Sequence, residues 1–294
     1  MRTLRVGAVA ALACAAIIAA GTSAAARDEV IRPYVLAAEA PGVLADVAAK
    51  TRSALTQAGF EVAGEYPVSG AAHVIVISSD ALRAAAAKTP EGGFGAVLRV
   101  SVTQAGEAVQ VAYTNPVWVA NACRLAAEPE GVAAALEKAL GRVEEFGSKN
   151  GFTVKNVRSY HYMMMMPYFD DQVVLGTFAS GAEAVARLEA GLAASKDARA
   201  IYRVEVPGTE QILFGVAILA GEGADDAVMK ITDTGARRHT AHLPYEVLVA
   251  GGRVAMLHGK FRIAQSFPDL TMGTFMKISG APDGIAKVLG GLLK

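Results

Sequence analysis

Apolar and polar residues follow two different periods along this chain, and each period occurs in both halves. A spacing of three to four residues between apolar positions predicts amphipathic helices over residues 43–60 and 182–196. Runs with the composition of β-strands follow each predicted helix. They cover residues 60–68, 72–78, 199–206 and 211–219.

Two further stretches carry the signature of a β-hairpin. Residues 94–113 alternate between apolar and polar over two runs that break near Ala105-Gly106. Residues 243–258 do the same and break at Gly251-Gly252. Because a glycine at the break between two alternating runs suits a tight turn, each stretch predicts two antiparallel strands.

A short internal repeat closes each half. Residues 129–136 read PEGVAAAL and residues 282–289 read PDGIAKVL, and in both the proline and the acid suit the first turn of a helix. The helical pattern breaks at FGSKNG, which puts a boundary near 147–151. The sequence therefore predicts an α+β fold of two tandem repeats, 27–149 and 150–294, each an antiparallel sheet with helices on one face.

Two stretches, GGFGAVLRVSVTQAGEAVQVAYTNP (92–116) and HTAHLPYEVLVAGGRVAMLHGKFRIAQSFPDLTMGTF (239–275), resemble the domain of unknown function 302 family. The resemblance implies a curved antiparallel sheet with helices in each repeat, in the TATA-binding-protein-like fold group. Because that family forms dimers of single-domain chains, two copies in one chain imply an intramolecular pseudo-dimer that is a monomer. The resemblance implies no activity and no catalytic residues, and the fold group alone does not imply DNA binding.

The first 26 residues have the three-part pattern of a cleaved secretory signal peptide. Arg2 and Arg5 precede an apolar run, and small residues end at Ala24-Ala25-Ala26. The alternative is an uncleaved membrane anchor, but the run is short for a span of about 20 residues. We therefore expect export to the periplasm or the medium, with no membrane span after cleavage of residues 1–26.

Charge and cysteine content narrow the function further. The chain has 28 basic and 28 acidic residues, so nothing in its net charge attracts nucleic acid or anionic lipid. Cys14 leaves with the signal peptide, and Cys123 is then the only cysteine of the mature chain. An internal disulfide cannot form, so the fold depends on core packing.

Four consecutive methionines stand in SYHYMMMMPYFDD, residues 159–171. If this stretch is the first strand of the second repeat, His161, Met163 and Met165 share one face. One imidazole and two thioethers are soft ligands that suit Cu(I), so these three residues are candidate copper ligands. The alternatives are a strand buried on both faces, with methionine filling irregular gaps, and the lining of an apolar ligand site.

Other candidate ligand-binding residues are Tyr162 and Tyr168, which would occupy the opposite face of the same strand. Their aromatic rings suit an apolar ligand.

His239 and His242 are separated by two residues, a spacing that can bind a metal on a turn or helix. Arg262 stands among apolar residues, where its guanidinium can hold an anionic ligand. The structural alternatives are an exposed segment leading into a strand for the histidines, and an ion pair with Asp269 for Arg262.

No catalytic motif stands out. The chain has no glycine-rich phosphate loop after a predicted strand, no G-x-S-x-G and no paired-cysteine or haem motif. We therefore predict a non-catalytic exported binding or accessory protein, whose ligand is an apolar small molecule or a soft metal such as copper. Two alternatives stay open: an enzyme using His239, His242, His258 and Arg262, and a protein-interaction module with an exposed sheet edge or apolar patch.

Overall fold

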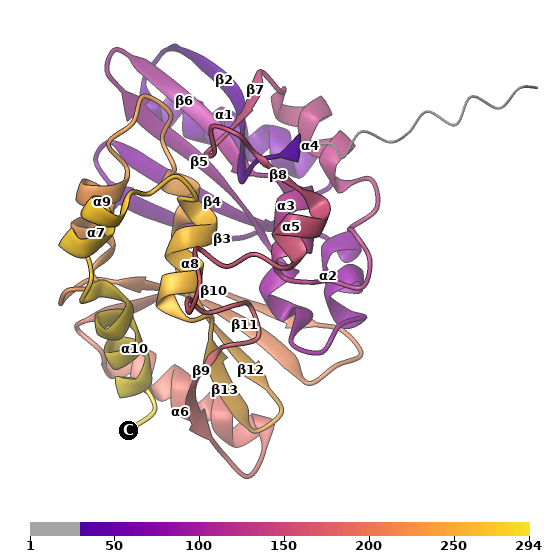
Figure 1. The fold of residues 1–294 in the computed structure, drawn as a ribbon. Coiled ribbons are helices and arrows are strands. Elements are labelled where there is room, and N and C mark those ends of the chain that lie inside the picture. The colour runs from indigo at the N-terminus through magenta and orange to yellow at the C-terminus, as the bar shows by residue number, and fades with distance from the viewer. Residues whose placement is uncertain (1–29) are drawn as a thin grey trace, which may run out of the picture.

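Two antiparallel sheets form the centre of the molecule, which the computed structural model describes over residues 30–294. The predicted signal peptide, 1–26, lies outside the described residues. The first sheet has six strands in the order β3-β4-β5-β6-β2-β7, and the second has five in the order β10-β11-β12-β13-β9. The first occupies the upper part of Figure 1 and the second the lower part. The predicted α+β class is confirmed.

The first half of the chain builds the six-stranded sheet. Its strands are β2 (Tyr34–Pro41), β3 (Glu61–Ser69), β4 (Ala72–Ser78), β5 (Leu98–Ala105), β6 (Ala108–Thr114) and β7 (Glu144–Phe146). Its helices are α1 (Leu44–Gln57), α2 (Asp80–Ala87), the 3-10 turn η1 (Gly92–Gly95), α3 (Pro116–Ala122) and α4 (Val132–Leu140).

The second half builds the five-stranded sheet. Its strands are β9 (Val173–Thr177), β10 (Ala198–Val206), β11 (Gln211–Ile218), β12 (Tyr245–Ala250) and β13 (Arg253–Met256). Its helices are α6 (Gly181–Ala194), α7 (Asp225–Thr232), the 3-10 turn η2 (Thr240–His242), α8 (Gly259–Ser266), α9 (Met272–Lys277) and α10 (Ala281–Gly291). Within residues 30–294 we find no helix with both the length and the apolarity of a membrane span.

Local sequence signals place these elements as predicted. Ser180 begins α6 by accepting a hydrogen bond from the Glu183 amide, and Asn115 begins α3 in the same way ahead of Pro116. The predicted hairpins are β5–β6 and β12–β13, and their turns contain Gly106 and Gly251 at positive φ. The helices and hairpins predicted from periodicity are thus confirmed.

The two sheets share one strand order. In the first, the strand that begins the half (β2) pairs with the last strand of the hairpin, β6. In the second, β9 pairs with β13 in the corresponding place. In both, four strands follow one another along the chain from the opposite edge, and the first sheet has β7 as an additional strand beside β2.

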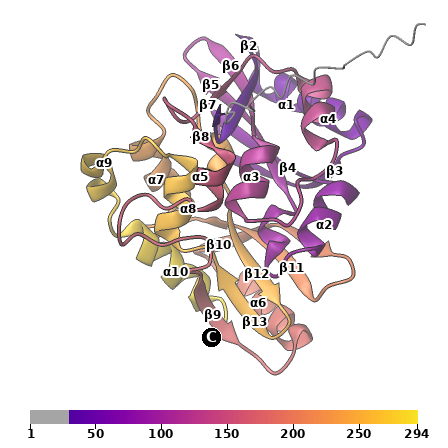
Figure 2. The same cartoon turned by 45° about the vertical axis from the view of Figure 1, so that its right-hand side comes forward.

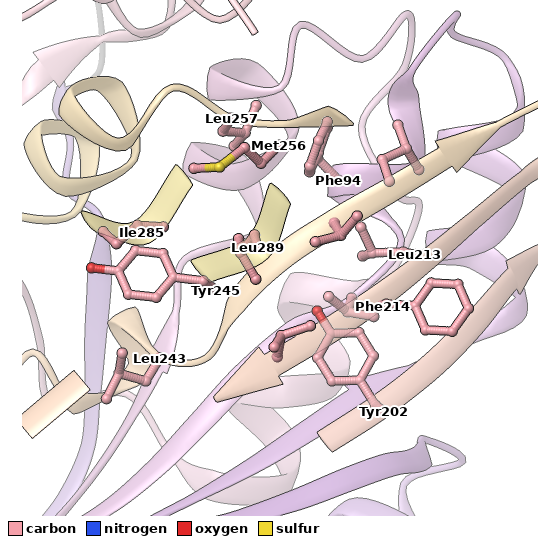
Figure 3. Packing of buried hydrophobic residues seen from close by; sticks show 14 of the residues in the cluster. Phe94, Tyr202, Leu213, Phe214, Leu243, Tyr245, Met256, Leu257, Ile285 and Leu289 are labelled. Carbon is pink, nitrogen blue, oxygen red and sulfur yellow. The ribbon is translucent and has the colours of Figure 1, made fainter. Parts of the chain in front are cut away.

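The two largest parts of the core lie on opposite faces of the first sheet. On β4, Ile75 and Ile77 belong to a cluster with Leu55 of α1 and Leu136 of α4. The alternate residues of β4 face the other way and join the larger core with the second half. Figure 3 shows that core, where Phe94 of the first half lies among residues of the second.

The chain after the predicted boundary still contacts the first half. The short strand β8 (Phe152–Thr153) pairs with β1 (Val30–Ile31). Helix α5 (Val154–Arg158) follows, and its Arg158 donates a hydrogen bond to the Leu125 carbonyl at 3.0 Å. The predicted boundary at 147–151 thus lies between two strands that both pair with strands of the first half.

The methionine run is not a strand, so that prediction is wrong. It lies in the loop between α5 and β9, and the Met166 amide donates to the Met163 carbonyl at 3.0 Å to close a turn. Met165 has a φ of +69°, which lies outside the β region. The place of the first strand is taken by β9, whose Val173 and Val174 pair with β13.

The edges of the two sheets meet where β3 packs against β10. A Cβ on Gly64 would overlap the main-chain oxygen of Ile201. We expect Gly64→Ala to lower the free energy of unfolding by about 1–3 kcal/mol, because the main chains must separate. Gly70→Ala is the matched control, since its Cβ would meet no atom within 4 Å. Urea unfolding measures both, and equal stability of the two variants would contradict this packing.

Candidate functional site

Arg262, one of the predicted ligand-binding residues, lies at the centre of a buried polar network. It stands on α8, is 3% exposed, and donates to five acceptors within the protein. Its side-chain acceptors are Glu246 Oε2 at 3.3 Å, His242 Nδ1 at 2.9 Å and Ser266 Oγ at 2.6 Å. The main-chain oxygens of His242 and Pro244 accept the remaining N–H groups. The guanidinium is therefore fully engaged by the protein itself.

Glu246 connects this arginine to the first half. Its carboxylate forms ion pairs with Arg262 and with Arg99 of β5, and it accepts a hydrogen bond from Tyr202 Oη at 3.2 Å. All three charged residues are at most 5% exposed. Burial lowers the pKa of Arg99 to about 10, and it also lowers that of Arg262. Two cations and one anion thus join the central strands of the two sheets.

The predicted alternative partner of Arg262, Asp269, does not pair with it. Asp269 instead accepts hydrogen bonds from Ser148 Oγ at 3.3 Å and from the Lys149 amide at 2.5 Å. The ion pair expected for Arg262 is real, but its carboxylate comes from a strand rather than from the adjacent loop.

His242 is neutral and belongs to the same network. Because its Nδ1 accepts from Arg262, the proton lies on Nε2, which is 3.1 Å from Tyr245 Oη. Burial, reinforced by Arg262 and Arg99, holds the pKa of His242 well below its usual range. His242 therefore acts as an acceptor for a buried arginine, and its spacing from His239 does not bring the two rings to one ligand.

The Glu246 carboxylate should be the most sensitive point of this network. We expect Glu246→Gln to lower the free energy of unfolding by roughly 3–5 kcal/mol, because two buried guanidiniums lose the one carboxylate that pairs with them within residues 30–294. Glu205→Gln, which alters the exposed pair with Arg203, should cost less than about 1 kcal/mol. Chemical denaturation of both variants checks the difference.

A second buried contact joins the halves at Asp225. Tyr66 of β3 donates to Asp225 Oδ2 at 2.7 Å, and the Ile218 amide donates to the same oxygen at 3.2 Å. Oδ1 is buried and has no partner within residues 30–294. Burial raises the pKa of the Asp225 carboxyl to about 7.

Stability should fall with rising pH because of Asp225. The unfolded carboxyl ionises from about 3.8, whereas the folded one keeps its proton to about 7, so the native state binds more protons between these values. The stabilising contribution is complete below pH 3.8 and is lost as pH rises to about 7. Asp225→Asn should remove much of the change in the thermal unfolding midpoint with pH over this window. Asp226→Asn, which alters an exposed carboxylate, should leave that change in place. Equal slopes in the two variants would contradict the assignment.

His239 lies in a different setting, at the wall of a cavity. Its ring stacks on Phe267 at 4.9 Å and meets Tyr34 and Phe146 edge-on at 5.1 and 5.4 Å. Its Nδ1 lies 3.4 Å from Asp233 Oδ1, and its amide donates to the same oxygen at 2.8 Å. Nδ1 is buried and makes no hydrogen bond within residues 30–294, so the Asp233 carboxylate only lies beside it, and Nε2 is on the opposite side of the ring.

The methionine turn is exposed. Met163, Met164 and Met165 are 44%, 83% and 95% exposed, while Met166 packs with Phe275 of α9 in a small apolar cavity. The loop crosses from α5 toward α8 and α9, as Figure 2 shows. The predicted burial of the run is therefore wrong for its first three methionines. In a turn these side chains point into solvent, whereas in a central strand they would have been packed against neighbouring residues.

The two predicted tyrosines fix the ends of this loop. Tyr162 Oη donates to the Leu270 carbonyl, and the Tyr168 ring packs at a tilt of 42° against His161 with ring centres 4.4 Å apart. His161 Nδ1 is 3.4 Å from the Ser159 carbonyl, so Nε2 is the nitrogen left for a ligand. His161 thus lies beside the methionine turn, although not on a shared strand face.

The remaining candidates have structural roles. His258 begins α8 by accepting the Lys260 amide at Nδ1, and His73 pairs with Glu65 at 2.9 Å. Cys123 is buried at the end of α3, and burial raises the pKa of its thiol to about 12. Within residues 30–294, no three His, Cys, Asp or Glu side chains gather as a metal cluster.

Sequence reasoning missed Arg99, Glu246, Lys149 and Arg237. A signal did exist for the first two, because each is a lone charge in a strand whose neighbours are apolar. Comparison with family models, curated proteins and solved structures found no match to this chain.

Proposed function

We propose that this protein is an exported, non-catalytic binding protein that holds a soft metal ion, Cu(I), on its methionine turn. The exposure of three consecutive methionines carries the proposal. A core explanation does not apply to them, because Met164 and Met165 contact solvent over most of their surface. An apolar surface that stays exposed among the described residues, 30–294, supports a binding role.

The chemistry of the turn favours a soft cation. Thioethers are neutral, polarisable ligands, and together with imidazole they prefer Cu(I) to the harder divalent ions. Met163, Met164 and Met165 supply three sulfurs from adjacent positions, and His161 supplies a nitrogen two residues away. The αL conformation of Met165 costs about 1–2 kcal/mol in an L-residue, which is a strain of the kind found at binding sites.

The remainder of the chain serves as a rigid support in this proposal. The common strand order of the two sheets supports two copies of one ancestral unit joined as a pseudo-dimer, in line with the resemblance to the domain of unknown function 302 family. The pattern of residues 1–26 supports export. Export places the methionine turn in a compartment where a protein can encounter copper.

Replacing sulfur by carbon tests the proposal. Met163→Leu/Met165→Leu keeps the side-chain volume, so stability should change little. We expect the parent to compete with a Cu(I) chelator and the double variant to lose at least about tenfold in affinity, or about 1.4 kcal/mol. Met256→Leu, in the buried core, is the matched control and should bind like the parent.

Two results would contradict the proposal. One is the absence of Cu(I) binding by the parent. The other is equal binding by the parent and the double variant, which would place the metal elsewhere.

A further inference from the structure

A cavity of about 470 Å³ lies where the end of the first half meets the second, and it shares only Leu270 with the small apolar cavity beside Met166. His239 forms part of its wall. The lining comes from three segments of the chain, which are 145–149, 231–239 and 267–274.

The cations of this cavity retain free hydrogen-bond donors. Arg237 uses Nε for Glu144 and Nη1 for Glu39, and its Nη2 bonds to no residue within 30–294. The Lys149 ammonium likewise has no hydrogen-bond or ion-pair partner in the described chain. His239 Nε2 also has no hydrogen-bond partner there, and the Asp233 carboxylate lies beside the other ring nitrogen, Nδ1.

The acids of the cavity already accept hydrogen bonds from the protein. Asp269 accepts at both oxygens, from Ser148 and from the Lys149 amide. Glu145 accepts at Oε1 from Asn115 and Arg142, and at Oε2 from the Arg32 amide. The cavity therefore presents unused N–H donors beside carboxylates that are already hydrogen-bonded, and an anion is the ligand that those donors can hold.

The rest of the lining is apolar or carries hydroxyl groups. Phe146, Phe267, Ile231 and Leu270 provide apolar surface beside the donors. An apolar wall with a few convergent polar groups is the usual composition of a small-molecule site.

We infer that this cavity binds a small organic anion, with its charged group on Lys149, Arg237 and His239 and its apolar body against Phe146, Phe267 and Leu270. The site requires no metal. It is independent of the methionine turn, so either proposal can fail alone.

Calorimetric titration with phenylacetate, phenyl phosphate and the neutral phenylacetamide tests the inference on residues 27–294. We expect at least one anion to bind and the amide to bind at least about tenfold more weakly, since it lacks the charge-assisted hydrogen bonds. Lys149→Met should weaken binding of that anion about tenfold, and His239→Gln should also weaken it. Preference for the phosphate or the carboxylate then identifies the anionic group.

Lys287→Met is the matched control, because Lys287 lines a separate cavity near the C-terminus. It removes the same charge and should leave binding unchanged. Met163→Leu/Met165→Leu should also bind the anion normally, which separates this site from the metal. Equal binding of anion and amide, equal weakening by Lys149→Met and Lys287→Met, or no binding of either anion would overturn the inference.

Discussion

The ion pairs of Glu246 with Arg99 and Arg262 are the constraint on which the arrangement of the two halves depends. They connect β5, β12 and α8 across the centre of the molecule. Burying two guanidiniums with one carboxylate is unfavourable unless the remaining polar atoms find partners. Arg262 meets that condition through His242, Ser266 and two carbonyl oxygens. The network therefore does little for net stability, but it allows only the packing in which every one of these partners is in place.

Other polar contacts lie along the same interface between the sheets and fix the position of η2. Thr103 of β5 donates to Thr240 at 2.9 Å, and Gln110 of β6 bonds to both the Ala236 carbonyl and the Arg238 amide. These contacts draw the segment before β12 against the first sheet. His239 lies within that segment, so its place at the cavity wall follows from contacts with the other half of the chain.

How far the sequence predicts this structure depends on the range of the interactions. Periodicity was sufficient for α1, α6 and the two hairpins, because the apolar spacing of a helix or strand is a local property. It failed for the methionine run, where apolar character without alternation left a strand and an exposed turn equally consistent with the sequence. Of the site residues, Arg262 and His242 were found as candidates for chemistry, yet their partner Glu246 and the contact with Arg99 were not. A charge in a strand gives no indication of the distant strand that neutralises it, so the pairing becomes visible only in the fold.

The connection between α8 and α9 positions both proposed sites. Leu270 lines the anion cavity and the small apolar cavity under Met166, and its carbonyl accepts the hydrogen bond from Tyr162. On the other side, Phe267 carries the ring of His239. Arg262 donates a hydrogen bond to Ser266 at the end of α8, and both residues are buried. The position at which the connection leaves α8 is therefore fixed. The buried network thus anchors one short segment, and that segment supports the methionine turn on one side and the aromatic wall of the cavity on the other.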